Sequence, residues 1–235
     1  MGLRLFQPSM RCAHDAARES VASRHPTRGE LAADCAIHVM GVAGGSVGGA
    51  TLVALIAVRG DWLELGALLI YALGMVAMFC CSAAYNLARS SPWRTTLRRC
   101  DHAAIFVMIA GTYTPFTLIT LRGPWGWSLF AIVWALAAIG MYLVVRGVER
   151  RAPVIALYVG LGWIGLVAIG PLVRNLPAGG LWLLFGGGVC YTLGVPFYLS
   201  RRLPYSHALW HAFVLAGSTL QFFAVLWYVL PAPLR

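Results

Sequence analysis

Two histidines, His207 and His211, stand four residues apart inside a long apolar stretch of the chain. On a helix this spacing places both imidazoles on one face, about 6 Å apart along the axis, where they can offer two nitrogens to one metal ion. Ionisable side chains inside a membrane helix are costly and usually mark function. The pair therefore predicts a metal site. The alternative is a pair of interfacial histidines bonded to the backbone or to water.

Two further polar groups could contribute to the same chemistry. Ser82 and Asn86 share one helix face and serve either a site or hydrogen bonding between helices. Asp101 and His102 follow Arg98 and Arg99 at the expected start of a helix, where an aspartate is a good N-cap. A capping Asp101 could still reach a water held by a metal ion, so the two roles are compatible.

A polar stripe precedes the first apolar run. Glu30, Asp34 and His38 recur every fourth residue, which puts them on one face of a helix. For Glu30 we favour the interpretation that it belongs to the interfacial start of that helix. His38 is treated as a further polar group at the depth of the candidate site.

The elements that carry these residues are long apolar helices. A helix needs about 20 apolar residues to cross a bilayer, and continuous runs of this length exclude the alternating pattern of a membrane β-barrel. The sequence therefore predicts an all-α bundle of seven transmembrane helices. Uncharged runs cover residues 36–58, 65–88, 103–121, 123–145, 152–173, 175–200 and 203–234.

The positive charge predicts how the bundle is oriented. All 18 basic residues are arginines, and fourteen of them lie in the N-terminal tail and in the loops after the second, fourth and sixth runs. Cytoplasmic loops are enriched in such residues, so we expect a cytoplasmic N-terminus and a C-terminus outside. Residues 1–30 are expected to form a cytoplasmic tail and residues 31–235 the membrane domain. The polar groups described above then all fall near the cytoplasmic face.

Composition narrows the class of protein. The chain is 60% hydrophobic and 11% charged, with a formal net charge of +10, whereas soluble domains carry about 25% charged residues. The arginines sit in short blocks between apolar runs, which favours membrane topology over nucleic-acid binding. We therefore expect a multi-pass protein of the cell (inner) membrane, with the lipid bilayer as its partner, a lipid as its substrate or ligand, and no nucleic acid.

Four segments resemble the hemolysin III family, the bacterial branch of the superfamily that contains the progestin and adiponectin receptors and, more distantly, the alkaline ceramidases. The matching segments follow the family's order and extend over most of the chain: Glu30–Gly41, Ser82–Asn86, Asp101–Phe116 and His207–Val214.

The resemblance implies a seven-helix bundle with zinc near its cytoplasmic side. In the family, two zinc ligands come from the seventh helix, here His207 and His211, and an aspartate of the third helix, here Asp101, holds the metal-bound water. The family serine, here Ser82, lies beside the site. A third ligand is a second-helix histidine, and this chain has Asn86 at that position. Either Asp101 completes a site of two histidines and one carboxylate, or zinc binds weakly or not at all.

Three functions are compatible with this pattern. The first is a zinc-dependent membrane hydrolase that acts on a lipid, for example an amide, with Asp101 and Ser82 as catalytic residues. The second is a pore-forming or membrane-perturbing protein, as the family name suggests. The third is a receptor-like protein that responds to a lipid and carries a structural metal.

Overall fold

The fold is described by a computed structural model at residues 26–58, 61–88, 91–147, 151–200 and 203–230. Every regular element in these ranges is helical, and seven helical stretches are long and apolar enough to cross a membrane. The all-α fold with seven spans is therefore confirmed. The expected tail of residues 1–30 falls mostly outside the described residues.

In chain order, the elements are α2 (Arg28–Ala57), α3 (Trp62–Leu87), α4 (Arg94–Pro115), η1 (Phe116–Thr120), α5 (Pro124–Val145), α6 (Arg151–Trp163), η2 (Ile164–Ala168), α7 (Ile169–Asn175), α8 (Ala178–Leu199), α9 (Ser206–Ala224) and η3 (Val225–Val229).

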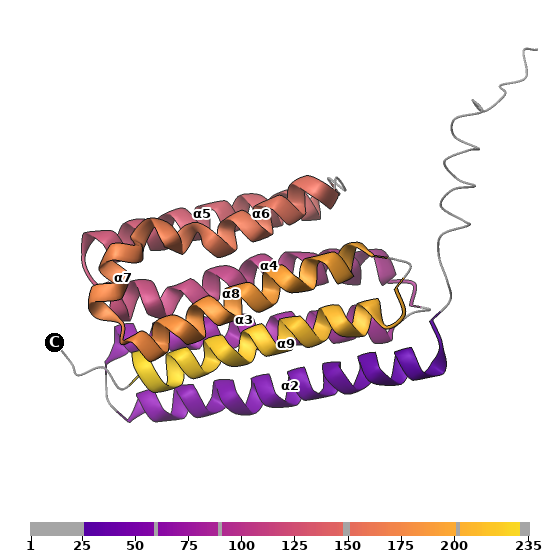
Figure 1. The fold of residues 1–235 in the computed structure, drawn as a ribbon, viewed down its shortest axis with the longest axis horizontal. Coiled ribbons are helices and arrows are strands. Elements are labelled where there is room, and N and C mark those ends of the chain that lie inside the picture. The colour runs from indigo at the N-terminus through magenta and orange to yellow at the C-terminus, as the bar shows by residue number, and fades with distance from the viewer. Residues whose placement is uncertain (1–25, 59–60, 89–90, 148–150, 201–202, 231–235) are drawn as a thin grey trace, which may run out of the picture.

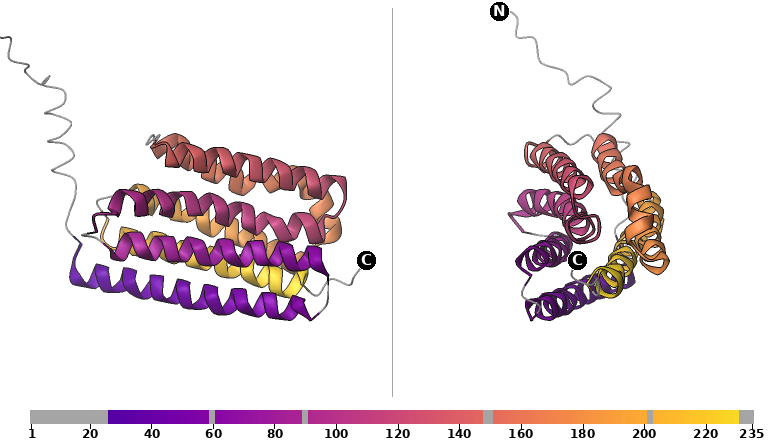
Figure 2. Two further views of the ribbon diagram at one scale, coloured as in Figure 1. Left: turned by 180° about the vertical axis from the view of Figure 1, so that it is seen from behind. Right: turned by 90° about the vertical axis from the view of Figure 1, so that its left-hand side faces the viewer.

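The helices follow one another around the bundle. The end-on view of Figure 2 shows α2, α3, α4 and α5 along one side and α6, α8 and α9 along the other. Consecutive helices pack together, and α9 also packs against α2, so that the last helix returns to the first. This closure brings side chains from opposite ends of the sequence together.

Glycines allow α2 to approach α3 closely. A Cβ atom added to Gly41 would lie 2.6 Å from the ring of Phe79, and one added to Gly45 would lie 3.0 Å from the same ring. Small residues at such positions let membrane helices approach at close range. Phe79 lies about one helical turn from Ser82. The contact therefore holds the middle of α2, about one turn beyond His38, against the part of α3 that leads to the site serine.

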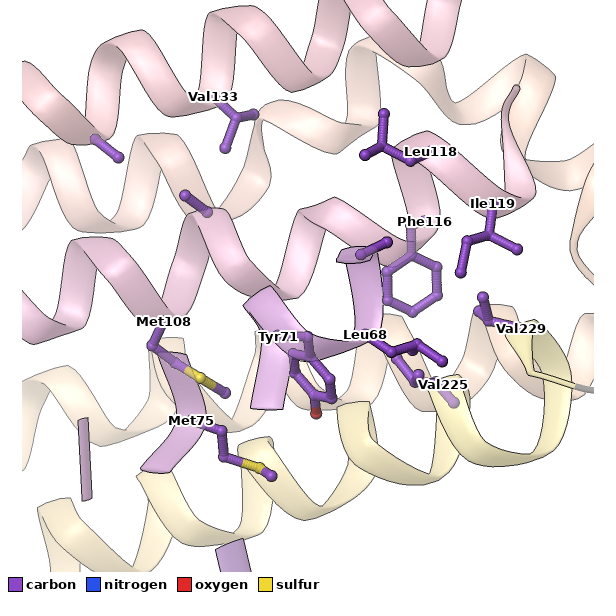
Figure 3. Packing of buried hydrophobic residues seen from close by; sticks show 14 of the residues in the cluster. Leu68, Tyr71, Met75, Met108, Phe116, Leu118, Ile119, Val133, Val225 and Val229 are labelled. Carbon is purple, nitrogen blue, oxygen red and sulfur yellow. The ribbon is translucent and has the colours of Figure 1, made fainter. Parts of the chain in front are cut away.

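Part of the apolar core lies at the other end of the bundle from the polar cluster described below. Figure 3 shows Leu68 and Tyr71 of α3 beside Phe116 of η1 and Val225 of η3, which continues α9. These four side chains are between 0 and 2% exposed. Because this packing joins the second, third and last spans, it fixes the directions in which α3, α4 and α9 run toward the other end.

An ion pair ties the start of α3 to the turn between η1 and α5. The Arg122 guanidinium donates to Glu64 across 2.6 Å, and the Glu64 side chain is only 4% exposed. Arg122 also lies 3.7 Å from Asp61. Asp61 caps α3 by accepting from the backbone of Leu63 and Glu64. The pair therefore neutralises a buried carboxylate at the end of the bundle remote from the polar cluster.

Removing this cation is expected to destabilise the bundle. In Arg122→Ala, Glu64 keeps its burial and loses this cation; because Arg122 is itself 38% exposed, the loss costs about 1–3 kcal/mol, as for a buried polar group left without its partner. Thermal unfolding in detergent should show a lowered melting temperature. Arg174→Ala removes an exposed arginine from the last turn of α7 and should have a much smaller effect. Equal melting temperatures for the two variants would contradict a stabilising role of the Arg122–Glu64 pair.

Candidate metal centre

Four helices deliver polar side chains to one end of the bundle. The helices α2, α4 and α9 begin at this end and α3 finishes there, at the right-hand side of Figure 1. Each contributes from its terminal turns, although the four segments are widely separated in the sequence. The convergence predicted from the spans and their directions is therefore present in the structure.

The centre of the cluster is a triad from α2 and α9. Asp34, His38 and His211 each offer one ligand atom, and these three atoms all lie within 4.8 Å of one another. The Asp34 Oδ1 and His211 Nδ1 atoms are 2.6 Å apart, and the rings of His38 and His211 are 4.4 Å apart. Asp34 and His38 are 5% and 4% exposed. Two imidazoles and a carboxylate form a ligand set that suits zinc and other divalent transition metals.

Hydrogen bonds fix the orientation of both histidine rings. The Nδ1–H group of His38 donates to the backbone carbonyl of Asp34 across 2.7 Å. Because a carbonyl can only accept, this bond leaves the lone pair of Nε2 available in the neutral ring. His211 Nδ1 donates to the Asp34 carboxylate. The bond from His38 to a backbone carbonyl is of the kind that sets the tautomer of a metal-binding histidine. His211 and Asp34 are both candidate ligands, and a metal ion would replace the bond between them.

Ser82 and Asp101 lie beside the triad. The Ser82 hydroxyl is 3.3 Å from His38 Nε2. Asp101 is hydrogen-bonded to Ser82 and interacts electrostatically with His38 and His211. The Asp101 side chain is 16% exposed, so it retains limited contact with solvent. A carboxylate and a hydroxyl from α4 and α3 therefore face the space next to the candidate ligands.

Asn86 and His207 take different positions from those of the triad. Asn86 Nδ2 donates to the Ser82 carbonyl across 2.9 Å, which turns the amide back along α3. The ring of His207 lies 6.5 Å from that of His211, and His207 interacts electrostatically with Asp34. Among the histidines, cysteines and acidic residues that the structure describes, His207 does not belong to the group of three close ligand atoms. Their roles as metal ligands remain predictions.

The expected N-cap at Asp101 is wrong. The helix α4 begins at Arg94 with Trp93 as its N-cap, which places Asp101 and His102 two turns inside it. Arginines limit the part of a helix that crosses the membrane, but they are good helix formers and do not end the helix. His102 engages α8 through its Nε2 atom, which lies 3.2 Å from the Tyr198 hydroxyl. Asp101 is therefore not the N-cap of α4, and capping does not determine where its carboxylate points.

Sequence reasoning placed Asp34 and His38 near the site without assigning them as ligands. Their signal was the repeat of polar residues at every fourth position from Glu30 onward. Glu30 itself forms a capping box with Thr27, in agreement with the expected role at a helix start. Asp34 and His38 meet His211 because α9 packs against α2. The sequence pattern does not show that these two helices are neighbours.

An apolar cavity of about 570 Å³ lies between the helices and opens to the surface beside exposed side chains such as Trp182. Its wall is formed mainly by α4, α6, α8 and α9 and includes Met108, Tyr158, Phe185 and Trp210. Trp210 directly precedes the candidate ligand His211 in α9. Binding sites for small molecules commonly have volumes of roughly 300 to 1,000 Å³ and mostly apolar walls. The cavity therefore has the size and lining for an apolar ligand close to the polar cluster.

Comparisons with known proteins agree with this architecture. The family model described as Haemolysin-III related matches residues 32–222. The chain is similar to Hemolysin-3 of Bacillus cereus, with 52% identity over 132 residues that cover 56% of this chain and 60% of that protein. It is also similar to the Hemolysin-3 homolog of Bacillus subtilis, with 38% identity over 70% of this chain and 78% of that protein. The human Monocyte to macrophage differentiation factor is 28% identical over 88% of both chains.

Proposed function

The chain belongs to the Haemolysin-III-related family, and from this premise we propose that it is a metal-dependent membrane hydrolase acting on a lipid amide or ester. The observation that carries the proposal is the buried triad of Asp34, His38 and His211, with Asp101 and Ser82 beside it. The triad can hold a cation, and its two neighbours have the chemistry of a general base and a hydrogen-bond donor. The apolar cavity supplies room for the hydrocarbon part of a substrate.

Zinc is the proposed metal, held by Asp34, His38 and His211. A bound zinc ion would supply a Lewis acid that polarises a carbonyl group and lowers the pKa of water toward 7. Because ligand nitrogens must be deprotonated, binding would displace the proton that His211 now donates to Asp34. The set predicted from the sequence, with His207, His211, Asp101 and Asn86, is the competing assignment.

The remaining residues supply proton transfer and orientation. Asp101 would accept the proton of the attacking water and return it to the leaving group, as a general acid–base residue does. Ser82 lies between Asp101 and His38, and its one hydroxyl hydrogen, which Asp101 accepts in the structure, would turn to the substrate carbonyl oxygen as negative charge develops there. Asn86 donates to the carbonyl of Ser82 and to its Oγ atom at 3.4 Å, and so holds this serine in place.

Membrane orientation forms part of the proposal. The helix ends that flank the arginine-rich loops lie at the end of the bundle that carries the triad, which favours a cytoplasmic location for that end in the inner membrane. A scissile bond at this depth would belong to the headgroup region of a lipid in the inner leaflet. The hydrocarbon chain of that lipid would extend toward the middle of the bilayer, along the direction of the cavity.

Metal-dependent turnover tests the proposal directly. The purified full-length protein, incubated with single-chain and two-chain lipid amides and esters in mixed micelles, should release fatty acid. A chelator should remove the activity and added zinc should restore it, because the reaction needs the cation. Mass spectrometry of the released fatty acid provides the measurement.

Each alternative function predicts a different result in the same preparation. A receptor-like protein with a structural metal would show no turnover, and its melting temperature would fall on metal removal. A pore-forming protein would release dye from liposomes at protein densities at which the hydrolase leaves vesicles intact. If fatty-acid release is the same with and without chelator, the metal-dependent mechanism is wrong.

A further inference from the structure

Glu30 connects the first turns of two helices. Its Oε2 atom accepts from the backbone N–H of Thr27 across 2.6 Å, and Thr27 Oγ1 accepts in return from the Glu30 backbone across 3.2 Å. Its Oε1 atom accepts from the backbone N–H of Tyr205 across 2.8 Å. The first oxygen closes the capping box of α2, and the second binds the N-cap residue of α9. The Glu30 side chain is buried, and its two bonds are partly buried.

Tyr205 holds an unusual conformation at this contact. It has φ +57° and ψ +14°, in the left-handed region that residues with a side chain seldom adopt. Its phenol lies against the first turn of α2, where a Cβ atom added to Gly29 would be 2.9 Å from the hydroxyl oxygen. The backbone bond to Glu30 and the packing on Gly29 are two independent contacts between Tyr205 and α2. Such surroundings are what allow a strained conformation to persist.

The two helices run in the same direction, and their contacts repeat along the seam between them. Asp34 follows Glu30 by four residues, or about 6 Å, and His211 follows Tyr205 by six residues, or about 9 Å. The first contact along the seam is Glu30 with Tyr205, and the next is Asp34 with His211. A shift of α9 by a small part of one turn would separate the Asp34 and His211 atoms that are now 2.6 Å apart.

We propose that Glu30 is a positioning residue that sets the register of α9 against α2 and thereby assembles the triad. This inference rests on the proposed function for its link to metal binding. The bond to Tyr205 itself does not depend on a metal. In this role Glu30 is not a ligand or a catalytic residue, and it acts through the position of His211.

Three substitutions separate positioning from simple helix capping. Glu30→Ala removes both bonds, and Thr27→Ala removes the cap of α2 while it leaves the bond between Glu30 and Tyr205. Glu30→Gln keeps an acceptor oxygen for Tyr205, and glutamine also serves in a capping box. Glu30→Asp keeps the charge on a side chain that is one methylene group shorter, and it replaces the alanine variant if that variant does not fold.

Two measurements on the full chain are needed. The first is hydrogen exchange of the amides of residues 205–211 in metal-free protein, and the second is zinc affinity by competition with a chromophoric chelator. Glu30→Ala should speed exchange in this segment at least tenfold and weaken zinc binding at least tenfold. Glu30→Gln should restore both to within about threefold of wild type. Thr27→Ala should lower the melting temperature and leave both within about twofold.

The two readouts distinguish this inference from the proposed function. If wild-type protein binds no zinc but Glu30→Ala still accelerates exchange in residues 205–211, the metal proposal fails and the positioning role stands. If Glu30→Ala and Thr27→Ala affect exchange equally, Glu30 only caps α2 and the inference is wrong. Exchange that remains at the wild-type rate in Glu30→Ala, or in Glu30→Asp where it is used, also overturns it.

Discussion

His211→Ala is expected to abolish zinc binding by the purified protein. In wild type, His211 Nδ1 lies 2.6 Å from Asp34 Oδ1, and its ring lies 4.4 Å from that of His38. Loss of this ring leaves one imidazole and one carboxylate, too few protein ligands for a stable zinc site. We expect an affinity at least a hundredfold lower, measured as zinc content after dialysis and by chelator competition. This prediction holds for the triad and for the ligand set predicted from the sequence.

The comparison of Asp34→Ala with His207→Ala decides between the two ligand sets. If Asp34, His38 and His211 hold the metal, Asp34→Ala should lose zinc nearly as completely as His211→Ala. His207→Ala should then retain a stoichiometric ion, with an affinity reduced about tenfold or less, because the His207 ring is 6.5 Å from that of His211. The opposite result, with zinc lost in His207→Ala and kept in Asp34→Ala, would support the seventh-helix pair.

A third histidine serves as the control for this comparison. His102 also lies near the site, but its nitrogens are engaged by the Arg98 carbonyl at 2.8 Å and the Tyr198 hydroxyl at 3.2 Å. His102→Ala should therefore keep its zinc. It also removes one bond between α4 and α8, so a lowered melting temperature with full zinc content is the expected outcome. Loss of zinc in this variant would show that the assay reports general loosening of the bundle.

The sequence predicted the spans well because lipid leaves few alternatives. In a bilayer every backbone group must be satisfied within the segment, so a long apolar run has to be a helix. The fourth run, predicted over residues 123–145, matches α5 at Pro124–Val145 almost residue for residue. Helix starts in water follow different rules. For this reason α2 begins at Arg28, where Thr27 and Glu30 form a capping box, eight residues before the apolar run at residue 36.

The depth of the site could be predicted, but its ligand geometry could not. Depth follows from the number of residues to the end of a span, and this arithmetic placed Ser82, Asp101 and His211 together. Which side chains of a helix point toward the site depends on the rotation and register of that helix against its neighbours. Here contacts such as Gly41 with Phe79 and Glu30 with Tyr205 set both. These contacts join residues distant in sequence. The sequence alone therefore favoured the HxxxH pair over Asp34 and His38.

Asp101→Asn is expected to abolish most of the proposed turnover while the protein keeps its metal. Asparagine has nearly the same shape and can still accept a hydrogen bond from Ser82, but it cannot take up a proton at catalytic rates. General acid–base catalysis contributes about 10²- to 10⁴-fold, so kcat should fall by a factor in this range. The steady-state rate of fatty-acid release and the zinc content of the same sample provide the measurement. KM should change little, because Asp101 acts on the attacking water.

Asp61→Asn provides the matched control for this variant. Asp61 caps α3 at the end of the bundle remote from the triad, and asparagine is an equally good N-cap, so activity and stability should stay near wild type. The combined readout assigns the role of Asp101. Low kcat with full zinc content identifies a general base, whereas loss of both identifies Asp101 as a ligand, as the sequence predicted. Wild-type turnover in Asp101→Asn would exclude both roles and leave the proton to another group of the cluster, of which His38 is the nearest to Ser82.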